Sequence, residues 1–403
     1  MGSGSGPRRT RRGAEAAVMN VSNVLVNVRA MAELAASASP WVPTRGPSKA
    51  SDVTAEWLTV KFGTRAPGAV ALSATSLGGT TGTTDRQRLA VEWNEVGKRA
   101  GLPVNIFVKS SPLTAKNRGM VAALGMSNNE VRLYQQMAGE LVGVCPKSWY
   151  SYAGIGARFL IVLDDIVACG AHPYALADRC GMEHARGLVD AFAELHSRFW
   201  ESPRFDGDLN WVRAWSTRPG NAVLKRFYKR GRRDALKLDR AEATPAVHAV
   251  AAALDANIDA YYREFEAGPL TLLHGDSHLG NTYSLPDGRS GLLDWQVIWR
   301  GPGLREIAYW MITGLDTDIR RAHERELLER YLEGLHRGGV PEAPTYDQAF
   351  ERYRLFSAEA WDAVAMTIAW PGLQAQENAE AGWRRACAAV EDLDTARAVN
   401  SLR

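Results

Sequence analysis

The sequence predicts an α+β protein made of two parts: a small first part built on an antiparallel sheet, and a larger, mainly helical second part. Strand-like segments separated by turns extend to about residue 164, whereas helical spacing of apolar residues dominates after about residue 183. Such a separation of strands from helices is typical of the α+β class. The 403 residues, 46% of them hydrophobic, are enough to bury two cores.

We place the two parts at residues 49–163 and 164–403, after a basic arm of residues 1–48. The arm starts with an arginine-rich run and continues with an apolar stretch that two asparagines and a serine interrupt. These interruptions are poor for the apolar core of an export signal. We therefore favour a flexible arm without a core face, or a true start at Met19.

Charge and cysteine content narrow the range of functions. The formal net charge of +3 is too small to indicate a nucleic-acid or membrane partner. The four cysteines lie far apart and show neither zinc-ligand spacing nor a disulfide framework, which is typical of a cytoplasmic protein. No run approaches the roughly 18 apolar residues of a membrane helix.

Residues 271–296 carry the clearest chemical signal. A polar loop holds Asp276 and, five positions later, Asn281. The turn residues at 286–289 then predict a hairpin whose second strand ends in Asp294. Because a hairpin brings its two ends together, we expect Asn281 and Asp294 to be neighbours, with Asp276 close by.

This set of oxygen donors suits phosphoryl transfer. Carboxylate and amide oxygens are good ligands for Mg²⁺, which keeps several of its waters. If Asn281 and Asp294 hold the metal, Asp276 is left to accept a proton from an attacking hydroxyl. A bare His-Gly-Asp loop can be an ordinary polar turn, but the hairpin and the second aspartate favour the catalytic interpretation.

The His-Gly-Asp motif ending at Asp276, with Asn281 and the Asp-Trp-Gln that begins at Asp294, resembles the signature of the aminoglycoside phosphotransferase and choline kinase superfamily. The wording is closest to its ecdysteroid-kinase-like branch. The resemblance runs from about residue 70 to about 390 and is sharp only at 272–296. It implies a bilobal protein-kinase-like fold and the use of ATP. It also implies Asp276 as the catalytic base and Asn281 and Asp294 as Mg²⁺ ligands.

A glycine-rich turn in the first part fits a nucleotide-binding lobe. It follows a strand predicted at residues 69–77 and precedes a return strand at 88–93, so that Gly78, Gly79 and Gly82 would lie between strands. Backbone N–H groups in such a turn can bind phosphates. An ordinary hairpin turn has the same composition.

The next strand ends in Lys109, and Glu130 opens a predicted helix at residues 130–137. Strand lysine followed by helix glutamate is the order found in kinases, where the pair acts on the α- and β-phosphates of the nucleotide. By this resemblance Glu130 holds Lys109 in place. The alternative is a solvated strand end and a carboxylate on the helix face.

A buried strand is predicted at residues 159–163. By resemblance, the segment that follows is the hinge between lobes, whose backbone contacts adenine: Leu163, Asp164, Asp165 and Ile166. The two aspartates can equally belong to a plain turn.

Other polar residues of the second part have simpler interpretations. His196 lies on the apolar face of a predicted helix and is expected to be a core histidine. Glu306 stands where the family usually has an aspartate, so local buttressing is expected to differ. We expect one basic set to form a solvated helix face: Lys225, Arg226, Lys229, Arg230, Arg232 and Arg233. Another set can line a substrate pocket, although we favour core tryptophans and solvated carboxylates: Trp361, Trp370, Trp383, Glu359, Asp362, Glu377 and Glu380.

The patterns together predict an ATP- and Mg²⁺-dependent kinase that phosphorylates a hydroxyl of a small molecule, such as an aminoglycoside, amino alcohol, sugar or steroid-like alcohol. A protein kinase is disfavoured because the His-Arg-Asp, Asp-Phe-Gly and Ala-Pro-Glu wordings do not occur at the corresponding places. A catalytically weak nucleotide-binding or scaffold protein on the same fold is the alternative.

Overall fold

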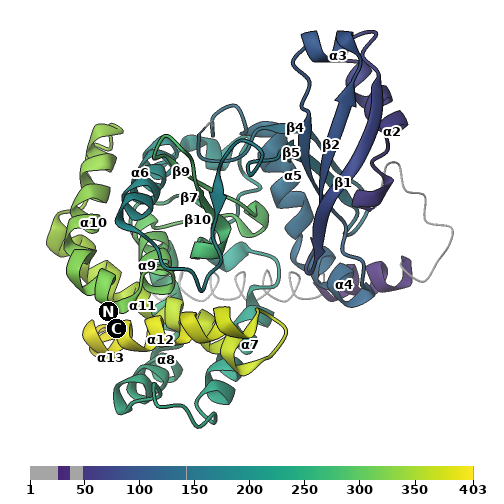
Figure 1. Cartoon of the computed structure of the whole chain (residues 1–403). Coiled ribbons are helices and arrows are strands. Elements are labelled where there is room, and N and C mark those ends of the chain that lie inside the picture. The colour runs from purple at the N-terminus through teal and green to yellow at the C-terminus, as the bar shows by residue number, and fades with distance from the viewer. Residues whose placement is uncertain (1–25, 37–48, 142, 403) are drawn as a thin grey trace, which may run out of the picture. The chain divides into compact units, whose positions relative to one another are not determined.

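The computed structural model describes residues 26–36, 49–141 and 143–402 and divides into two compact units, Met1–Gly170 and Ala171–Arg403 (Figure 1). The division falls a few residues beyond the boundary expected at residue 163. The first unit contains an antiparallel sheet and the second is mainly helical, so the predicted α+β class is confirmed.

The sheet of the first unit has five strands in the order β1-β2-β3-β5-β4, and every neighbouring pair is antiparallel. Its strands are β1 (Ala71–Thr81), β2 (Asp85–Trp93), β3 (Asn105–Ser110), β4 (Ser148–Ala153) and β5 (Phe159–Asp164). Alternate residues of the central strands enter one core, among them Ile106 and Val108 of β3 and Leu160 and Val162 of β5, and α2 (Ala55–Gly63) packs into the same core through Leu58 and Phe62.

The described part of the first unit also contains the helices α3 (Glu95–Arg99), α4 (Ala115–Leu124) and α5 (Met126–Gln136). The Thr114 hydroxyl caps α4 by accepting a hydrogen bond from the Asn117 N–H. Gly125 has a φ of +68° and ends α4, which lets the chain turn directly into α5. Helix α4 is therefore defined at both ends by local sequence signals, and α5, which carries Glu130, begins where α4 ends.

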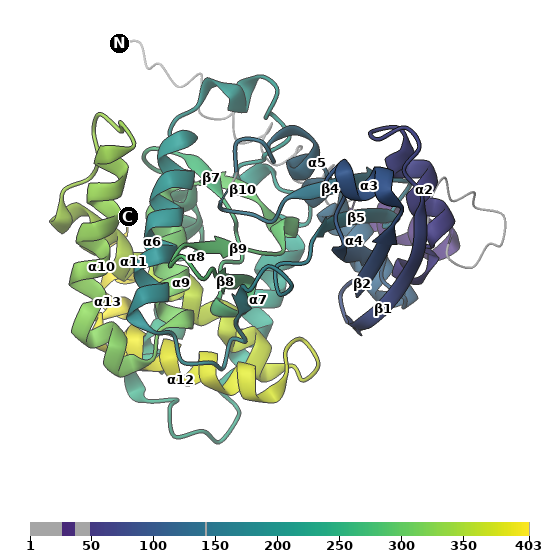
Figure 2. The ribbon, with the colours of Figure 1, turned by 45° about the horizontal axis from the view of Figure 1, so that its top comes forward.

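The second unit surrounds two small sheets with helices, and α6 packs along α10 (Figure 2). The sheets contain β10 (Trp299–Gly301) with β7 (Thr271–Leu273), and β6 (His172–Pro173) with β8 (Thr282–Ser284) and β9 (Ser290–Leu292). The longer helices are α6 (Met182–Arg198), α7 (Asn221–Ala235), α8 (Pro245–Arg263), α9 (Gly303–Gly314), α10 (Thr317–Arg337), α11 (Tyr346–Ala369) and α12 (Gln376–Asp392), followed by the short α13 (Thr395–Asn400). No helix in the described part of the chain is long and apolar enough to cross a membrane.

The glycine-rich turn is shorter than predicted. Strand β1 continues to Thr81, so Gly78 and Gly79 lie in the strand, and the turn is reduced to residues 82–84. A bulge between Ser76 and Gly79 absorbs the extra length. A Cβ on Gly79 would lie 2.3 Å from the carbonyl oxygen of Arg86, which explains why glycine is needed inside the strand.

The predicted flexible arm is also corrected in part. Its residues 1–25 and 37–48 lie outside the described residues, but residues 26–36 are helical. Val26 and Glu33 in this helix are buried, at 5% and 2% exposure. An arm without a core face would not bury these side chains.

Candidate functional site

Asp276 lies on the loop between β7 and the hairpin formed by β8 and β9. Its Oδ1 accepts a hydrogen bond of 2.9 Å from the hydroxyl of Tyr309 on α9, and its Oδ2 lies 3.9 Å from Nε2 of His278. The Asp276 side chain is 42% exposed to solvent. The carboxylate is thus fixed in orientation while it remains accessible to another molecule.

Asn281 is tied to the same loop. Its side-chain Nδ2 donates to the backbone oxygen of Asp276 at 2.8 Å, which orients the amide through its nitrogen. Its backbone oxygen accepts the N–H of Leu293 at 2.8 Å, next to the β-pair of Thr282 with Leu292. The hairpin therefore brings Asn281 beside the residue that precedes Asp294, as its predicted register requires.

Asp294 has a left-handed backbone, with φ +65° and ψ +66°. For a residue other than glycine this conformation costs about 1–3 kcal/mol, and such residues cluster at functional sites. Trp295, which follows it, is fully buried and donates from Nε1 to the Leu292 oxygen at 3.3 Å. The packed Trp295 fixes the chain directly after this strained position.

The donor chemistry of Asn281 and Asp294 fits Mg²⁺. An amide oxygen and a carboxylate are hard ligands, and Mg²⁺ is commonly held by one or two carboxylates together with waters and substrate phosphates. In the described ranges, no group of three or more histidine, cysteine, aspartate or glutamate side chains is arranged to hold a metal. Asn281 and Asp294 supply two oxygen donors, and the other positions around Mg²⁺ are usually filled by water and substrate phosphates.

Glu306 on α9 holds the loop from behind. Its two carboxylate oxygens accept the backbone N–H groups of His274 and Gly275, each at 2.8 Å, and His196 Nε2 lies 3.3 Å from Oε2. Burial alone would raise the pKa of Glu306, but the hydrogen bond from His196 and the nearby His196, His274 and Arg305 outweigh it and lower the pKa to about 2. Glu306 is therefore a charged anchor for the loop backbone.

Gly275 permits the close approach of this loop to the rest of the unit. Its φ is +90°, and a Cβ there would lie 2.4 Å from the carbonyl oxygen of Val297. His196 is the core histidine that the sequence predicts, fully buried, with Nδ1 2.8 Å from the hydroxyl of Tyr331. Its contact with Glu306 also makes it part of the support for the loop.

Two arginines that the sequence did not single out lie near the Asp276 loop. Arg305 is buried, pairs with Glu359 and donates to the Gly275 oxygen at 3.2 Å. Arg218 packs against Trp215 and Trp299, with 5.4 Å to each ring centroid. Burial lowers the pKa of Arg218 to about 10, partly opposed by Tyr228, Glu359 and Asp276. These cations come from distant positions in the chain, so no local motif marks them.

The tryptophans proposed as an alternative pocket lining belong mainly to the core. Trp361 and Trp383 are fully buried and lie 6.2 Å apart between ring centroids. Trp370 donates from Nε1 to Asp234 at 3.2 Å. Glu377 is exposed and Glu380 is half-buried, which agrees with solvated carboxylates.

Two buried carboxylates depart from that expectation. Asp362 and Glu359 have only 4% and 3% exposure, and each pairs with a buried arginine, Arg232 and Arg305 respectively. Burial raises the pKa of Asp362 to about 6 although Arg232 opposes the shift. Arg232 is therefore a core ion-pair partner, and the basic set on α7 is not entirely a solvated face.

In the first unit, Lys109 on β3 and Glu130 on α5 form an ion pair with 2.7 Å between Nζ and Oε2. Both side chains are almost fully buried, at 4% and 1% exposure. The alternative of a solvated strand end is thus wrong, and the predicted pairing is present. A role of this pair in nucleotide binding stays a prediction.

The predicted hinge begins at the end of β5. Leu163 pairs with Phe107 of β3, and Asp165 is buried at 2% exposure. Asp165 accepts hydrogen bonds from Arg88 Nε at 2.8 Å and from the Val167 N–H at 3.1 Å, so it is more than a solvated turn residue. The Ile166 oxygen accepts the Cys169 N–H at 3.1 Å. That the backbone of Leu163, Asp164, Asp165 and Ile166 contacts adenine stays a prediction.

Comparison with solved structures finds distant similarity. The choline kinase LicA from Streptococcus pneumoniae is 13% identical, with 84% of this chain and 98% of that chain covered and a TM-score of 0.45. An ethanolamine kinase from Plasmodium vivax is 11% identical, with 83% and 86% covered and a TM-score of 0.46. Aminoglycoside 2'-phosphotransferase-IIIa is 12% identical, with 84% and 99% covered and a TM-score of 0.44.

No curated protein sequence matches the chain. A family model described as the phosphotransferase enzyme family does match, over residues 127–356, which is more than half of the chain. The matched region includes Glu130 and the whole stretch from His274 to Asp294 but not Lys109. It does not distinguish an ecdysteroid-kinase-like branch. By this match, the chain belongs to the phosphotransferase enzyme family.

Proposed function

We propose that the protein is an ATP- and Mg²⁺-dependent kinase that transfers the γ-phosphoryl group to a hydroxyl of a small molecule. The observation that carries this proposal is the arrangement at Asp276. Its carboxylate is accessible, oriented by Tyr309 and mounted on a loop whose backbone N–H groups bind the buried Glu306. Catalytic geometry of this kind needs a fixed but reachable group.

In this proposal Asp276 accepts a hydrogen bond from the acceptor hydroxyl and takes its proton as the oxygen attacks the γ-phosphorus and ADP leaves with the bridging oxygen. The transition state of phosphoryl transfer is loose, so positioning of the hydroxyl matters more than early proton removal. The Tyr309 hydroxyl already donates to Oδ1, so Oδ2 is the atom that would face the acceptor hydroxyl. The acceptor is an alcohol such as an aminoglycoside, amino alcohol, sugar or steroid-like alcohol.

Asn281 and Asp294 would hold Mg²⁺. When bound, the metal would neutralise phosphate charge and orient the transferred group. The amide of Asn281 is already oriented by its bond to the Asp276 backbone, and Asp294 lies at a fixed left-handed position beside it in the chain turn. Ligands held in place before the metal arrives lose less freedom when they bind it.

On the first unit, we assign the α- and β-phosphates of the nucleotide to Lys109. The buried ion pair with Glu130 supports this role, because it holds the lysine in one place. The glycine-rich turn at residues 82–84 would donate backbone N–H groups. The backbone of Leu163 to Ile166 would contact the adenine.

The test is phosphate transfer from ATP by the full chain, measured over a panel of neutral, cationic and acidic alcohols with and without Mg²⁺. We expect Mg²⁺-dependent formation of a phosphorylated product with at least one alcohol. The alternative, a weak nucleotide-binding or scaffold protein, predicts ATP binding without product for every alcohol. Asp276→Asn separates the two, since only in an enzyme should it lower turnover while ATP binding is kept.

A further inference from the structure

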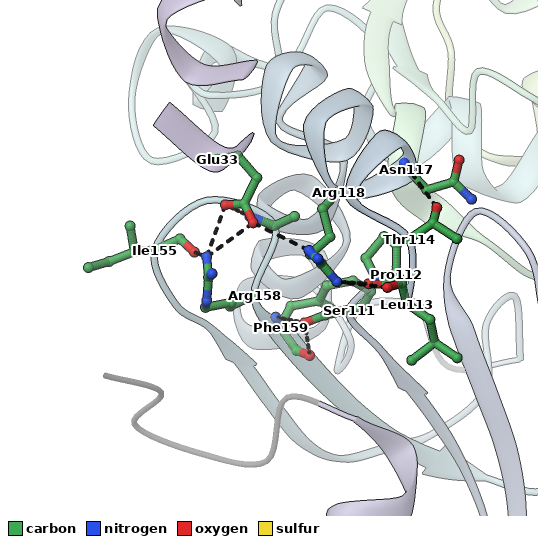
Figure 3. Close-up of polar contacts among 11 residues, drawn as sticks. Glu33, Ser111, Pro112, Leu113, Thr114, Asn117, Arg118, Ile155, Arg158 and Phe159 are labelled. Carbon is green, nitrogen blue, oxygen red and sulfur yellow. Dashed lines mark hydrogen bonds and ion pairs between the residues drawn. The ribbon is translucent and has the colours of Figure 1, made fainter. Parts of the chain in front are cut away.

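The helical residues 26–36 are fastened to the first unit through one buried carboxylate, that of Glu33 (Figure 3). Arg158 Nη1 donates to both carboxylate oxygens, at 3.2 Å and 3.0 Å, and the Ala157 N–H donates at 3.2 Å. Arg118 Nε lies 3.8 Å from Oε1. Two cations and a backbone donor therefore converge on a carboxylate that has 1% exposure.

The shape of the contact is as specific as its charge. Gly156 has a φ of +68°, and a Cβ built on it would lie only 1.8 Å from Oε2 of Glu33. Glu33 thus occupies the space that a side chain at position 156 would need. One residue later, Leu34 lies over Gly119 of α4, with 3.7 Å from its Cδ2 to the position of a Cβ. Burial of a carboxylate is costly without such partners, so a fitted and paired Glu33 indicates a defined docking site.

Arg118 connects this docking site to the strand that carries Lys109. Besides facing Glu33, its Nη1 donates to the carbonyl oxygens of Pro112 and Leu113, at 3.1 Å and 2.9 Å (Figure 3). These two residues follow β3 after a single intervening residue. Ser111, between them and the strand, accepts the Phe159 N–H at 3.1 Å and so ties the same segment to β5.

The neighbouring residue of α4 connects the docking site to the glycine-rich turn. Asn117 Nδ2 donates to the carbonyl oxygen of Gly82 at 2.7 Å. Asn117 and Arg118 both lie in the first turns of α4, whose start is fixed by the Thr114 cap. A displacement of this end of α4 would therefore move the Gly82 turn and the segment after Lys109 together.

We propose that Glu33 is a positioning residue for the nucleotide unit: by fixing Arg118 it sets the place of the α4 start, and through it the Gly82 turn and the end of the Lys109 strand. The nucleotide part of this inference rests on the function proposed above. The structural part, that Glu33 fixes the positions of these segments, does not depend on that function, because it concerns contacts within the first unit alone.

The variant that tests it is Glu33→Gln, which keeps the size of the side chain and removes its charge. Glu95→Gln is the control, since Glu95 lies in the same unit on an exposed pair with Lys98. Hydrogen–deuterium exchange should become faster in Glu33→Gln at peptides covering residues 80–86 and 110–120. Residues 271–296 and the control variant should exchange as in the wild type. Unchanged exchange at both peptides would overturn the proposal, whatever the activity of the protein.

ATP titration supplies the second readout. We expect Glu33→Gln to weaken ATP binding by between about 2-fold and 30-fold, the range of an indirect coupling, with KM for the acceptor unchanged. Arg118→Gln should give a similar loss, and the double variant should be no weaker than the stronger single one. Faster exchange with unaltered ATP affinity would show that Glu33 only docks the helix, and the positioning role would be wrong.

Discussion

The lysine and the aspartate at the centre of the proposed reaction are held in different ways. Lys109 is buried and paired with the carboxylate of Glu130 on α5. Asp276 is far more exposed, but its loop is bound through backbone N–H groups to Glu306, and its carboxylate is bound to Tyr309. An ion pair with one carboxylate holds the lysine side chain, whereas hydrogen bonds to the loop backbone hold the aspartate.

This difference determines what a substitution at each place should do. A change at Lys109 removes the charge proposed to bind the phosphates and also takes the cation away from the buried Glu130, so it should weaken ATP binding and lower the stability of the first unit. A change at a support of the Asp276 loop alters the positions of several groups at once, and with them the stability of the unit. The predictions below compare the two places, beginning with the largest expected effect.

Asp294→Ala should abolish Mg²⁺-dependent turnover, because it removes the only carboxylate of the proposed metal pair. The fold should survive, since Asp294 is only partly buried and the buried Trp295 beside it is unchanged. Turnover against Mg²⁺ concentration is the measurement. Asp287→Ala, on the exposed turn of the same hairpin, is the control and should behave as the wild type. Full activity of Asp294→Ala would remove it from the metal site.

Glu306→Gln should lower the free energy of unfolding by about 3–5 kcal/mol, the usual cost of breaking a buried charged network. The pKa of Glu306 is about 2 in the folded chain, below its ordinary value of 4.5. Its stabilising effect is therefore present above pH 4.5 and is lost as the pH falls toward 2. Chemical denaturation of both proteins between pH 7 and pH 2.5 should show a difference that shrinks over this window. A difference that does not depend on pH would contradict the role of a charged anchor.

Lys109→Ala should raise KM for ATP by about 10- to 100-fold, the value of one charged hydrogen bond, with a smaller effect of Glu130→Ala in the same direction. Steady-state kinetics with ATP as the varied substrate is the measurement, and Lys98→Ala, on the exposed pair with Glu95, is the matched control. Wild-type KM in both Lys109→Ala and Glu130→Ala would mean that this pair is structural.

Two N-terminal truncations should have different effects on Tm. Removal of residues 1–25 should leave Tm nearly unchanged, because Glu33 and its partners are kept. Removal of residues 1–36 should lower Tm by several degrees, since Arg158 and the Ala157 N–H lose a buried carboxylate. Thermal unfolding followed by circular dichroism distinguishes the cuts. Equal Tm values for both would mean that the helix does not dock.

The sequence was most informative where the chemistry is local. Asn281 and Asp294 are separated by one hairpin, and turn residues predict their approach because the register of a short hairpin is set by its turn. Lys109 and Glu130 were found through the order of a strand and a helix. Both inferences depend on short chain separations, for which spacing and secondary structure are enough.

The parts that the sequence missed depend on long-range packing. Tyr309 reaches Asp276 from a helix 33 positions away, Arg118 reaches Glu33 from 85 positions away, and neither has a spacing that a motif can capture. The glycine-rich turn was misplaced for another reason. Glycine usually breaks a strand, but Gly79 is needed inside β1 because Arg86 approaches its backbone too closely for a side chain.

The central claim, that Asp276 accepts the proton of the acceptor hydroxyl, is tested most directly by Asp276→Asn. The asparagine keeps the size of the side chain and its hydrogen bond to Tyr309, but it does not take up a proton. We predict a fall in kcat of about 10²- to 10⁴-fold, with ATP affinity measured by titration near the wild-type value. If Asp276→Asn loses ATP binding while its ternary complex turns over at the wild-type rate, Asp276 is a metal ligand or a structural residue, and the claim is wrong.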